Sequence, residues 1–229
     1  MIRRLFATAA IASLAIAPVQ LAAQESEDAA APAEEQRTFG KINYNMQEER
    51  ENILVLDLSN GQRVAIRLMP SWAPNHVERI KTLTRQGFYD GIIFHRVIEG
   101  FMAQTGDPTG TGQGGSPLPD LAEEFNPMPH IRGTVSMARA QSEDSANSQF
   151  FITFMPRFGL DKNYTNFGRV ISGMAAVDAI NRGEPPANPT RILQASIASD
   201  NKPVPVAAPR SADVDEPVTL DMLNAPSGN

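Results

Sequence analysis

The chain of 229 residues contains no cysteine, and it has fewer basic than acidic residues. The missing cysteine excludes disulfides, thiol nucleophiles and thiolate metal sites. With 20 Lys and Arg against 26 Asp and Glu, the net charge is −6, so we expect no nucleic acid partner, because such partners select a basic surface. The three histidines, His76, His95 and His130, lack metal-ligand spacing, so we expect no metal site.

Long hydrophobic runs are also missing, apart from one near the N-terminus. The run from Leu5 to Ala17 follows Arg3 and Arg4, is too short to span a bilayer and precedes small residues. This order is typical of a secretory signal peptide, and we predict one at 1–23, cleaved after Ala23. A buried N-terminal helix is the alternative. General secretory export is favoured over twin-arginine export because the twin-arginine motif is incomplete. The mature chain is then expected to have no membrane span.

The remaining sequence divides by composition into three parts. Residues 24–49 are a polar spacer and lead-in that begins with a Glu- and Ala-rich stretch without apolar periodicity. Residues 50–199 carry apolar alternation and are predicted to form one domain. Residues 200–229 are rich in Pro, Ala, Ser and Asp, which predicts a disordered tail.

Within the domain, the pattern predicts many short strands and few helices. Apolar alternation over 53–58 and 64–68, with Asn60-Gly61 between, predicts a hairpin with a type I′ turn. Pro74 in the first turn and Gly87 after the last predict a helix over 74–86. A second short helix is expected near 174–181, and further strands over 92–98, 134–137, 149–154, 166–170 and 191–197. This pattern is typical of a mostly β barrel or sandwich.

Several features suggest chemistry but favour ordinary structure. The run Gly110–Gly115 satisfies GxGxxG, yet prolines follow it where a dinucleotide site needs a helix, so we predict a surface loop. Glu123-Glu124 is predicted to be a solvated loop, since neighbours on a strand face opposite ways. His76 is expected on an exposed helix face, His130 in a loop, and His95 as a packed or hydrogen-bonded residue rather than a base.

Three separated motifs carry the functional signal. They are Phe94–Asp107 (FHRVIEGFMAQTGD), Ser136–Ala140 (SMARA) and Ser148–Thr153 (SQFFIT). Together they resemble the cyclophilin family of peptidyl-prolyl cis-trans isomerases, and the resemblance covers about residues 50 to 199. It implies a mostly β fold, namely an eight-stranded antiparallel closed barrel capped by two α-helices. It also implies isomerase activity on proline-containing polypeptides.

Prolyl isomerisation explains why these residue types suffice without a cofactor. The reaction breaks no covalent bond, and its barrier of about 18–20 kcal/mol comes from amide resonance. In the twisted transition state the proline nitrogen regains a lone pair, which a hydrogen-bond donor stabilises. The resemblance assigns this role to Arg96, whose guanidinium is always charged; a surface salt bridge is the alternative. Gln104 resembles the residue that orients the arginine and bonds the peptide.

The resemblance also implies a set of substrate-binding residues. Strand alternation places Phe151 on the face opposite to Phe150 and Ile152, which suit the core. Phe101 and Met102 are neighbours, so they share a pocket only if a bulge or strand end lies there. The segment 138–140 matches the part of the family that pairs with substrate backbone like an added strand. The full set is Phe101, Met102, Gly112, Ala138, Arg139, Ala140, Gln149, Phe151, Leu160 and Tyr164.

Three positions depart from the animal pattern of the family. Arg139 stands where asparagine is common, Tyr164 where histidine often sits, and Gly159 at a tryptophan that contacts cyclosporin. These changes resemble bacterial secreted cyclophilins. We therefore predict a monomeric, periplasmic isomerase that acts on exported proteins. The alternative is a non-catalytic cyclophilin-fold chaperone or scaffold that binds Pro-containing segments.

Overall fold

A computed structural model describes residues 38–205. The predicted signal peptide, most of the spacer and most of the tail lie outside these described residues. The strands are β1 (Ile53–Leu58), β2 (Arg63–Leu68), β3 (Arg96–Ile98), β4 (Met102–Thr105), β5 (Thr134–Met137), β6 (Phe150–Thr153), β7 (Asn166–Ser172) and β8 (Ile192–Ile197). The α-helices are α1 (Pro74–Arg85) and α2 (Met174–Asp178), and the short 3₁₀ helices are η1 (Arg50–Asn52), η2 (Phe158–Leu160) and η3 (Ala198–Asp200).

The predicted hairpin of β1 and β2 is confirmed, but its turn is of another type. Gly61 has a φ of 78°, whereas Asn60 is not among the residues with positive φ, which a type I′ turn would require. The N–H of Gly61 donates to the carbonyl of Leu58 at 3.0 Å. The loop is therefore a type I turn followed by a left-handed glycine, and the extra loop residue relieves Asn60 of the left-handed conformation.

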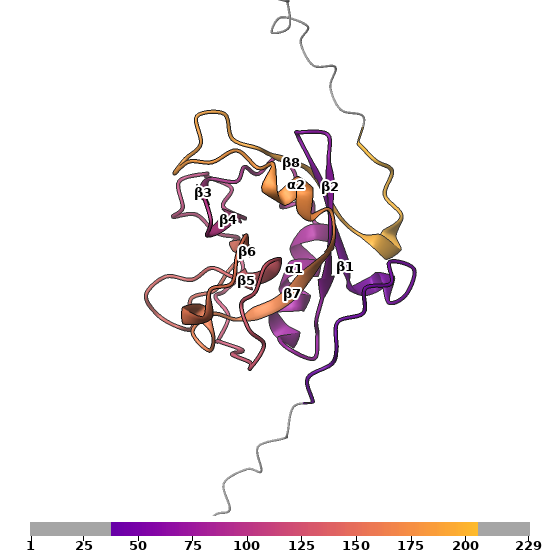
Figure 1. Ribbon diagram of the computed structural model, residues 1–229, viewed down its shortest axis with the longest axis vertical. Helices are drawn as coiled ribbons and strands as arrows, with labels where there is room; N and C mark the ends of the chain where they lie inside the picture. The colour runs from indigo at the N-terminus through magenta and orange to yellow at the C-terminus, as the bar shows by residue number, and fades with distance from the viewer. Residues whose placement is uncertain (1–37, 206–229) are drawn as a thin grey trace, which may run out of the picture. The chain divides into compact units, whose positions relative to one another are not determined.

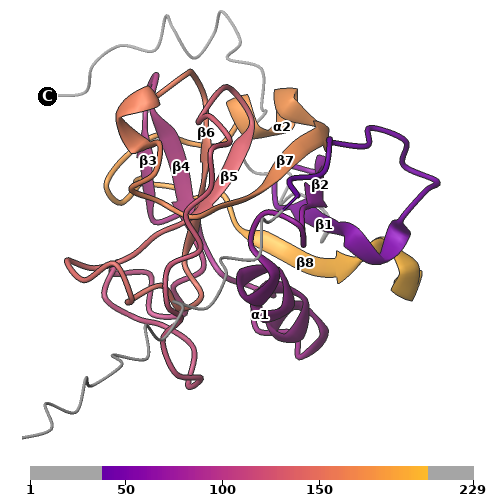
Figure 2. The same ribbon diagram turned by 90° about the horizontal axis from the view of Figure 1, so that it is seen from below.

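The eight strands form one antiparallel sheet that curls but does not close. Their order is β3-β4-β6-β5-β7-β2-β1-β8, so β3 and β8 are the two edges (Figures 1 and 2). The predicted closed barrel is wrong; the sheet is an open half-barrel. Near these edges lie isolated bridges of Ile93 to Arg191 and of Val97 to Gly183. Pro185, Pro186 and Pro189 interrupt the approach to β8, and residues without an N–H cannot extend a ladder.

Both predicted helices are present, at opposite ends of the sheet (Figure 2). α1 begins at Pro74, as expected, and its first turn is capped from a distant loop. The Glu124 carboxylate accepts the backbone N–H groups of Asn75 and His76, at 3.1 and 3.0 Å, and the His76 side chain at 2.6 Å. His76 and Glu124 are both buried, so the expectations of an exposed His76 and a solvated Glu124 are wrong.

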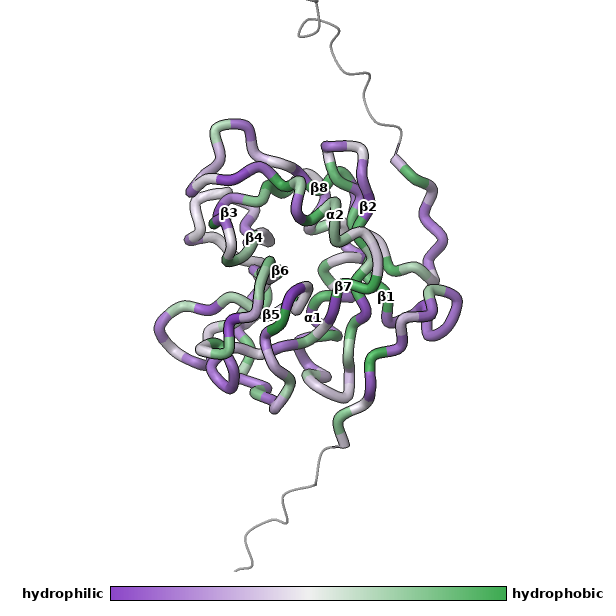
Figure 3. Tube along the Cα trace, in the orientation of Figure 1, coloured by the Kyte–Doolittle hydropathy of each residue, from purple (hydrophilic) through white to green (hydrophobic). Residues whose placement is uncertain are grey.

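The core lies inside the curl of the sheet, where the hydrophobic stretches of β1 and β2 contrast with the polar outer loops (Figure 3). Alternation along β6 is as predicted, because Phe150 and Ile152 belong to this core. Phe150 packs edge-to-face against Tyr89 and Phe167, with ring centroids 5.6 and 6.2 Å apart. The inward face is thus filled by side chains, which leaves the outward face of β3, β4 and β6 for a site.

The lead-in before β1 is held by a buried arginine. Arg67 is 0% exposed, and its guanidinium donates to four carbonyls, those of Asn43, Asn45, Glu48 and Glu49. The Trp72 indole N–H donates to the carbonyl of Gly40 at 2.9 Å. Because a buried guanidinium must be hydrogen-bonded, residues 40–49 pack as part of the domain.

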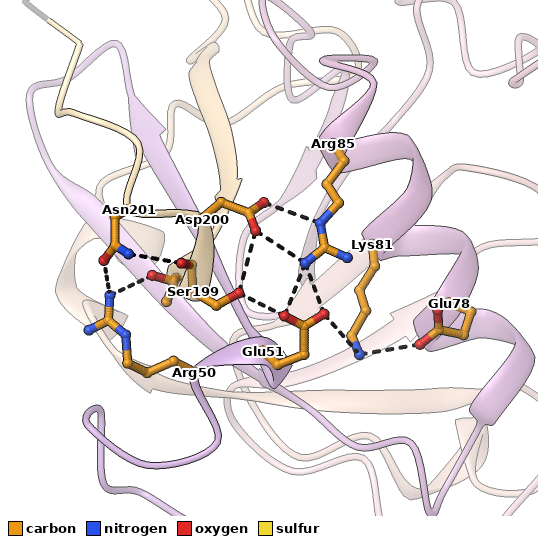
Figure 4. A network of polar contacts seen from close by, with 9 residues as sticks. Arg50, Glu51, Glu78, Lys81, Arg85, Ser199, Asp200 and Asn201 are labelled. Atoms are coloured by element: carbon orange, nitrogen blue, oxygen red, sulfur yellow. Dashed lines mark hydrogen bonds and ion pairs between the residues drawn. The ribbon is translucent and has the colours of Figure 1, made fainter.

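Polar contacts between side chains join η1, α1 and η3 (Figure 4). Arg85 pairs with Glu51 at 2.8 Å and with Asp200 at 3.1 Å, and Arg50 donates to the Asn201 side chain at 2.7 Å. We call these five residues the terminal clamp. The clamp carries ordered structure past residue 199, where the sequence pattern placed the end of the domain.

Candidate active site

The registers of three neighbouring strands align a row of side chains on the outward face of the sheet. Arg96 of β3 pairs with Gln104 of β4, Gln104 pairs with Phe151 of β6, and Phe151 pairs with Ser136 of β5. The adjacent row points the other way, into the core, and consists of Val97, Ala103 and Ile152. Period-two alternation therefore separates the packing residues from the candidate site residues.

A cleft of about 680 Å³ opens over this row. The sequence-predicted residues that line it are Arg96, Phe101, Met102, Gln104, Gly112, Ala138, Arg139, Phe151, Leu160 and Tyr164. Ala140 and Gln149 line an adjoining hollow of about 570 Å³, which shares Gln104, Gly112 and Arg139 with the cleft. All the residues predicted from the motifs are thus brought to one face, although they come from distant parts of the chain.

Arg96 enters the cleft with one side of its guanidinium already bound. Its Nε donates to Glu184 Oε2 at 2.8 Å, and the two side chains are 41% and 52% exposed. Among residues 38–205, neither Nη of Arg96 has a hydrogen-bond partner. The expected partner Gln104 lies opposite Arg96 in the register, but its amide donates instead to Gln149 Oε1 at 2.9 Å.

The glycine-rich loop forms one wall and is fixed by a buried aspartate. Asp107 accepts the backbone N–H groups of Thr109 at 2.7 Å and Gly112 at 2.6 Å. Burial acts to raise the pKa of Asp107, but these bonds and others from the loop outweigh it, and the pKa is lowered. Gln149 Nε2 then donates to the carbonyls of Gly112 and Gly114. The GxGxxG run is therefore a structured wall of the cleft, and it precedes no helix.

The cleft has an apolar floor of aromatic side chains. Phe151 is 4% exposed, and Tyr164 packs edge-to-face on it with ring centroids 5.7 Å apart. The Arg139 guanidinium lies over the Tyr164 ring at 5.0 Å. β4 begins at Met102, so Phe101 occupies a strand end, which is the condition under which both reach one pocket. An apolar floor beside a guanidinium suits a proline ring next to its amide.

A serine, a histidine and an aspartate lie behind this floor with the spacing of a hydrolase triad. Ser136 Oγ is 2.8 Å from His130 Nε2, and His130 Nδ1 is 2.8 Å from Asp161 Oδ1. Ser136 is 0% exposed, and His130 stacks against Phe151 with ring centroids 6.3 Å apart. Because a nucleophile must reach its substrate, this trio supports the Phe151 wall and performs no acyl transfer. Burial lowers the pKa of His130, against the opposing effect of Asp161.

His95 lines the cleft but is not arranged as a general base. It is 5% exposed, and neither ring nitrogen has a hydrogen-bond partner among the described residues. Burial lowers the pKa of His95 from its ordinary value. A base needs a partner that orients its ring, and none is present within 38–205. His95 is packed as expected, but it is not hydrogen-bonded.

Glu184 and Pro185, which also line the cleft, were missed by the sequence reasoning. They belong to the segment Gly183–Pro186, whose Glu184-Pro185 peptide is cis. Nothing in the local pattern ties this proline-rich run to Arg96, which lies 88 residues earlier. The sequence does not single out Glu184 as the partner of Arg96, since the chain has 26 acidic residues.

Comparison with known proteins settles the family. Residues 53–197 match the family model for cyclophilin type peptidyl-prolyl cis-trans isomerase/CLD. The chain belongs to the cyclophilin family. A curated relative from Brucella suis, named a probable peptidyl-prolyl cis-trans isomerase, is 45% identical over 181 residues, which cover 72% of this chain and 92% of the relative. This cyclophilin is thus a peptidyl-prolyl cis-trans isomerase, as the motifs predicted.

Solved structures agree with this fold. Cyclophilin AquaCyp293 from Hirschia baltica gives a TM-score of 0.62 at 29% identity and covers 68% of this chain and 77% of its own. A Cryptosporidium parvum cyclophilin type isomerase, crystallised in the presence of the dipeptide Ala-Pro, gives 0.59 at 30% identity, over 63% of this chain and 98% of its own. The described part of this cyclophilin contains no helix long and apolar enough to cross a bilayer.

Proposed function

We propose that this cyclophilin isomerises X-Pro bonds of exported proteins in the periplasm, with Arg96 as the donor to the proline nitrogen. The observation that carries the mechanism is the cleft itself: Arg96 lines it beside Phe151 and Met102, with both Nη groups free of partners among residues 38–205. A proline ring on the apolar floor then lies within reach of a charged donor. The Ala-Pro dipeptide named with the C. parvum structure supports a substrate of this kind.

The proposed catalysis needs only differential binding. A planar amide nitrogen is a poor acceptor, so Arg96 bonds it weakly in the ground state and strongly in the twisted transition state. A ~10⁴-fold acceleration requires about 5.5 kcal/mol of such stabilisation. No covalent intermediate, proton transfer or cofactor enters this scheme.

Substrate backbone is proposed to pair with the segment 138–140. The N–H of Ala138 already donates to the carbonyl of Gln149, and the N–H of Ala140 donates to Ser145 Oγ. The backbone of Arg139 lies between them and is our candidate for strand-like pairing. Because such pairing uses the main chain, arginine in place of asparagine at this position costs little.

A protease-coupled assay on a panel of X-Pro peptides tests the mechanism. We expect turnover by the wild type, and for Arg96→Ala we expect retained peptide binding with kcat/KM lower by about one to three orders of magnitude. The alternative, a non-catalytic scaffold of the same fold, predicts peptide binding by both proteins and turnover by neither. An active Arg96→Ala protein would exclude Arg96 as the essential donor.

Export is supported by the N-terminal sequence, where a basic pair precedes an apolar run and small residues. Intact-mass analysis of protein recovered from the periplasm of a bacterial host tests it. We expect a chain that begins at Gln24 and elutes as a monomer. A periplasmic product that retains Met1 would contradict the predicted cleavage.

A further inference from the structure

A backbone bridge places Glu184 directly opposite Arg96. Val97 and Gly183 exchange two hydrogen bonds, at 2.8 and 2.9 Å, on the edge of β3 that is away from β4. In an antiparallel pair, the residue before one member faces the residue after the other, so Arg96 and Glu184 are cross-strand neighbours. Next to a hydrogen-bonded pair the side chains approach closely, which suits an ion pair.

The segment that carries Glu184 is anchored before the bridge and at the bridge itself. Before it, the Asn181 side chain donates to the carbonyl of Asn188 at 2.7 Å, and its N–H donates to Thr190 Oγ1 at 3.1 Å. At the bridge, Gly183 has a φ of 141°, and a Cβ there would lie 2.5 Å from the Cα of Pro186. The chain therefore accepts only glycine at this point, and the position of Glu184 follows from the backbone.

Glu184 binds one particular nitrogen of the Arg96 guanidinium. The carboxylate accepts from Nε at 2.8 Å, on the side of the fork nearest the side-chain stem. A guanidinium is planar, so fixing Nε fixes the plane in which both Nη groups lie. Without this partner, the end of the side chain would rotate, and Nε would compete with the Nη groups for the substrate.

We propose that Glu184 is a positioning residue, which holds Arg96 by Nε and presents the two Nη groups to the proline amide. This inference rests on the proposed role of Arg96 as donor. Both partners are partly exposed, so the pair contributes little to folding. Its effect falls on catalysis, because a donor that is held in place before the reaction loses less freedom in the transition state.

The chain offers a matched control for this pair. Glu99 Oε2 accepts from Arg182 Nε at 2.7 Å, through the same atoms and with both side chains partly exposed, at 77% and 29%, but Glu99 does not line the cleft. Glu184→Ala is expected to lower kcat/KM about tenfold, mainly through kcat. Glu99→Ala is expected to leave both constants within about twofold. Equal effects of the two substitutions would overturn the positioning role.

Conservative variants separate positioning from charge. Glu184→Gln keeps an oxygen that accepts from Nε, so we expect it to recover most of the activity lost in Glu184→Ala. In an Arg96→Lys background there is no Nε, and Glu184→Ala should have no further effect. A Glu184→Gln protein as slow as Glu184→Ala, or an additive effect in the lysine background, would contradict the proposal.

A spectroscopic readout does not depend on turnover. The Nε–H resonance of Arg96 should be sharp and slow to exchange in the wild type and in Glu184→Gln, and broadened in Glu184→Ala. If Arg96→Ala retains wild-type activity, the proposed function itself fails. If Arg96→Ala is inactive while Glu184→Ala matches the wild type in rate and spectrum, this inference alone fails.

Discussion

Two arginines on different strands of the sheet, Arg67 and Arg96, show how one residue type serves structure or function. Arg67 on β2 is fully buried, and its guanidinium donates to four carbonyls of the lead-in. Arg96 on β3 is 41% exposed, and its guanidinium makes one hydrogen bond, to Glu184, within the described residues. The first guanidinium has its bonding capacity nearly filled by the protein, and the second keeps most of its capacity for a ligand.

The difference teaches that unused hydrogen-bonding capacity in a cleft marks function better than charge alone. Burial lowers the pKa of Arg67, yet the carbonyls around it meet the need for hydrogen-bond partners. Removing Arg67 should therefore lower the free energy of unfolding and leave kcat/KM nearly unchanged. Removing Arg96 should lower kcat/KM and leave the free energy of unfolding nearly unchanged. Substitutions at the two arginines test this contrast directly, and the terminal clamp and the pH profile extend it to weaker contacts and to the cleft, in order of decreasing expected effect.

Arg67→Met should lower the free energy of unfolding by about 3–5 kcal/mol, because several carbonyls lose a buried donor at once. Urea denaturation followed by circular dichroism measures this. Arg67→Lys should recover only part of the loss, since an ammonium cannot span the same acceptors. The kcat/KM of the folded fraction should change by less than about twofold. A loss of stability below about 1 kcal/mol would show that water replaces the guanidinium without penalty.

Arg96→Ala should lower kcat/KM by one to three orders of magnitude, about 1.4–4 kcal/mol of transition-state stabilisation. Stability should change by less than about 0.5 kcal/mol, because the side chain is partly exposed and its single ion pair, with Glu184, is also partly exposed. Arg96→Lys should remain slow, since lysine lacks the planar fork. The protease-coupled assay and urea denaturation together give both numbers. An unfolded Arg96→Ala protein would show that Arg96, like Arg67, is required for folding.

Ending the chain after Ser199 should cost about 0.5–1 kcal/mol, because it removes Asp200 and Asn201 from the partly exposed terminal clamp. A chain that ends after Pro205 keeps the clamp and serves as the control. Thermal unfolding of the two truncated chains measures the difference. Identical melting temperatures would show that the clamp pairs are no stronger than their contacts with water.

Between about pH 6 and 9, kcat/KM should be nearly flat, because the guanidinium stays charged and no proton is transferred. Burial lowers the pKa of His95 from its ordinary value, which favours the neutral form of this cleft residue. A histidine whose pKa is lower in the folded chain binds protons more readily when unfolded, so stability falls as pH drops below its ordinary value of 6.5. Activity that titrates near pH 6.5 would reopen a catalytic role for His95.

The sequence alone was sufficient for the elements and side chains that local patterns encode. Alternation assigned Phe150 and Ile152 to the core, and the motifs named residues that all line one face. Pro74 and Gly87 marked the ends of α1 because each acts within its own turn. A sequence pattern therefore predicts the structure well where the contacts that decide it join residues close together in the sequence.

The predictions that were wrong or missed concern contacts between residues that are distant in sequence. Glu124 looked like a solvated loop residue because its role, capping α1, depends on a helix 48 residues away. Glu184 went unnoticed because the bridge to Val97 is set by the path of the chain before β8. The closed barrel was wrong because prolines near residue 185 prevent a continuous ladder. Long-range register of this kind is not encoded in any short window.

The pairing of β1 with β8 has a consequence for when this protein can fold. Arg50 at the start of the domain donates to the carbonyl of Ala198, 148 residues later, and β1 forms its second ladder with β8. During synthesis, the sheet can therefore be completed only after β8, the last strand, has left the ribosome and can pair with β1. Contacts so distant in sequence also slow folding. Under the export proposed above, this delay would lengthen the time for which the chain stays unfolded, because the strand that completes its sheet is nearly the last to be made.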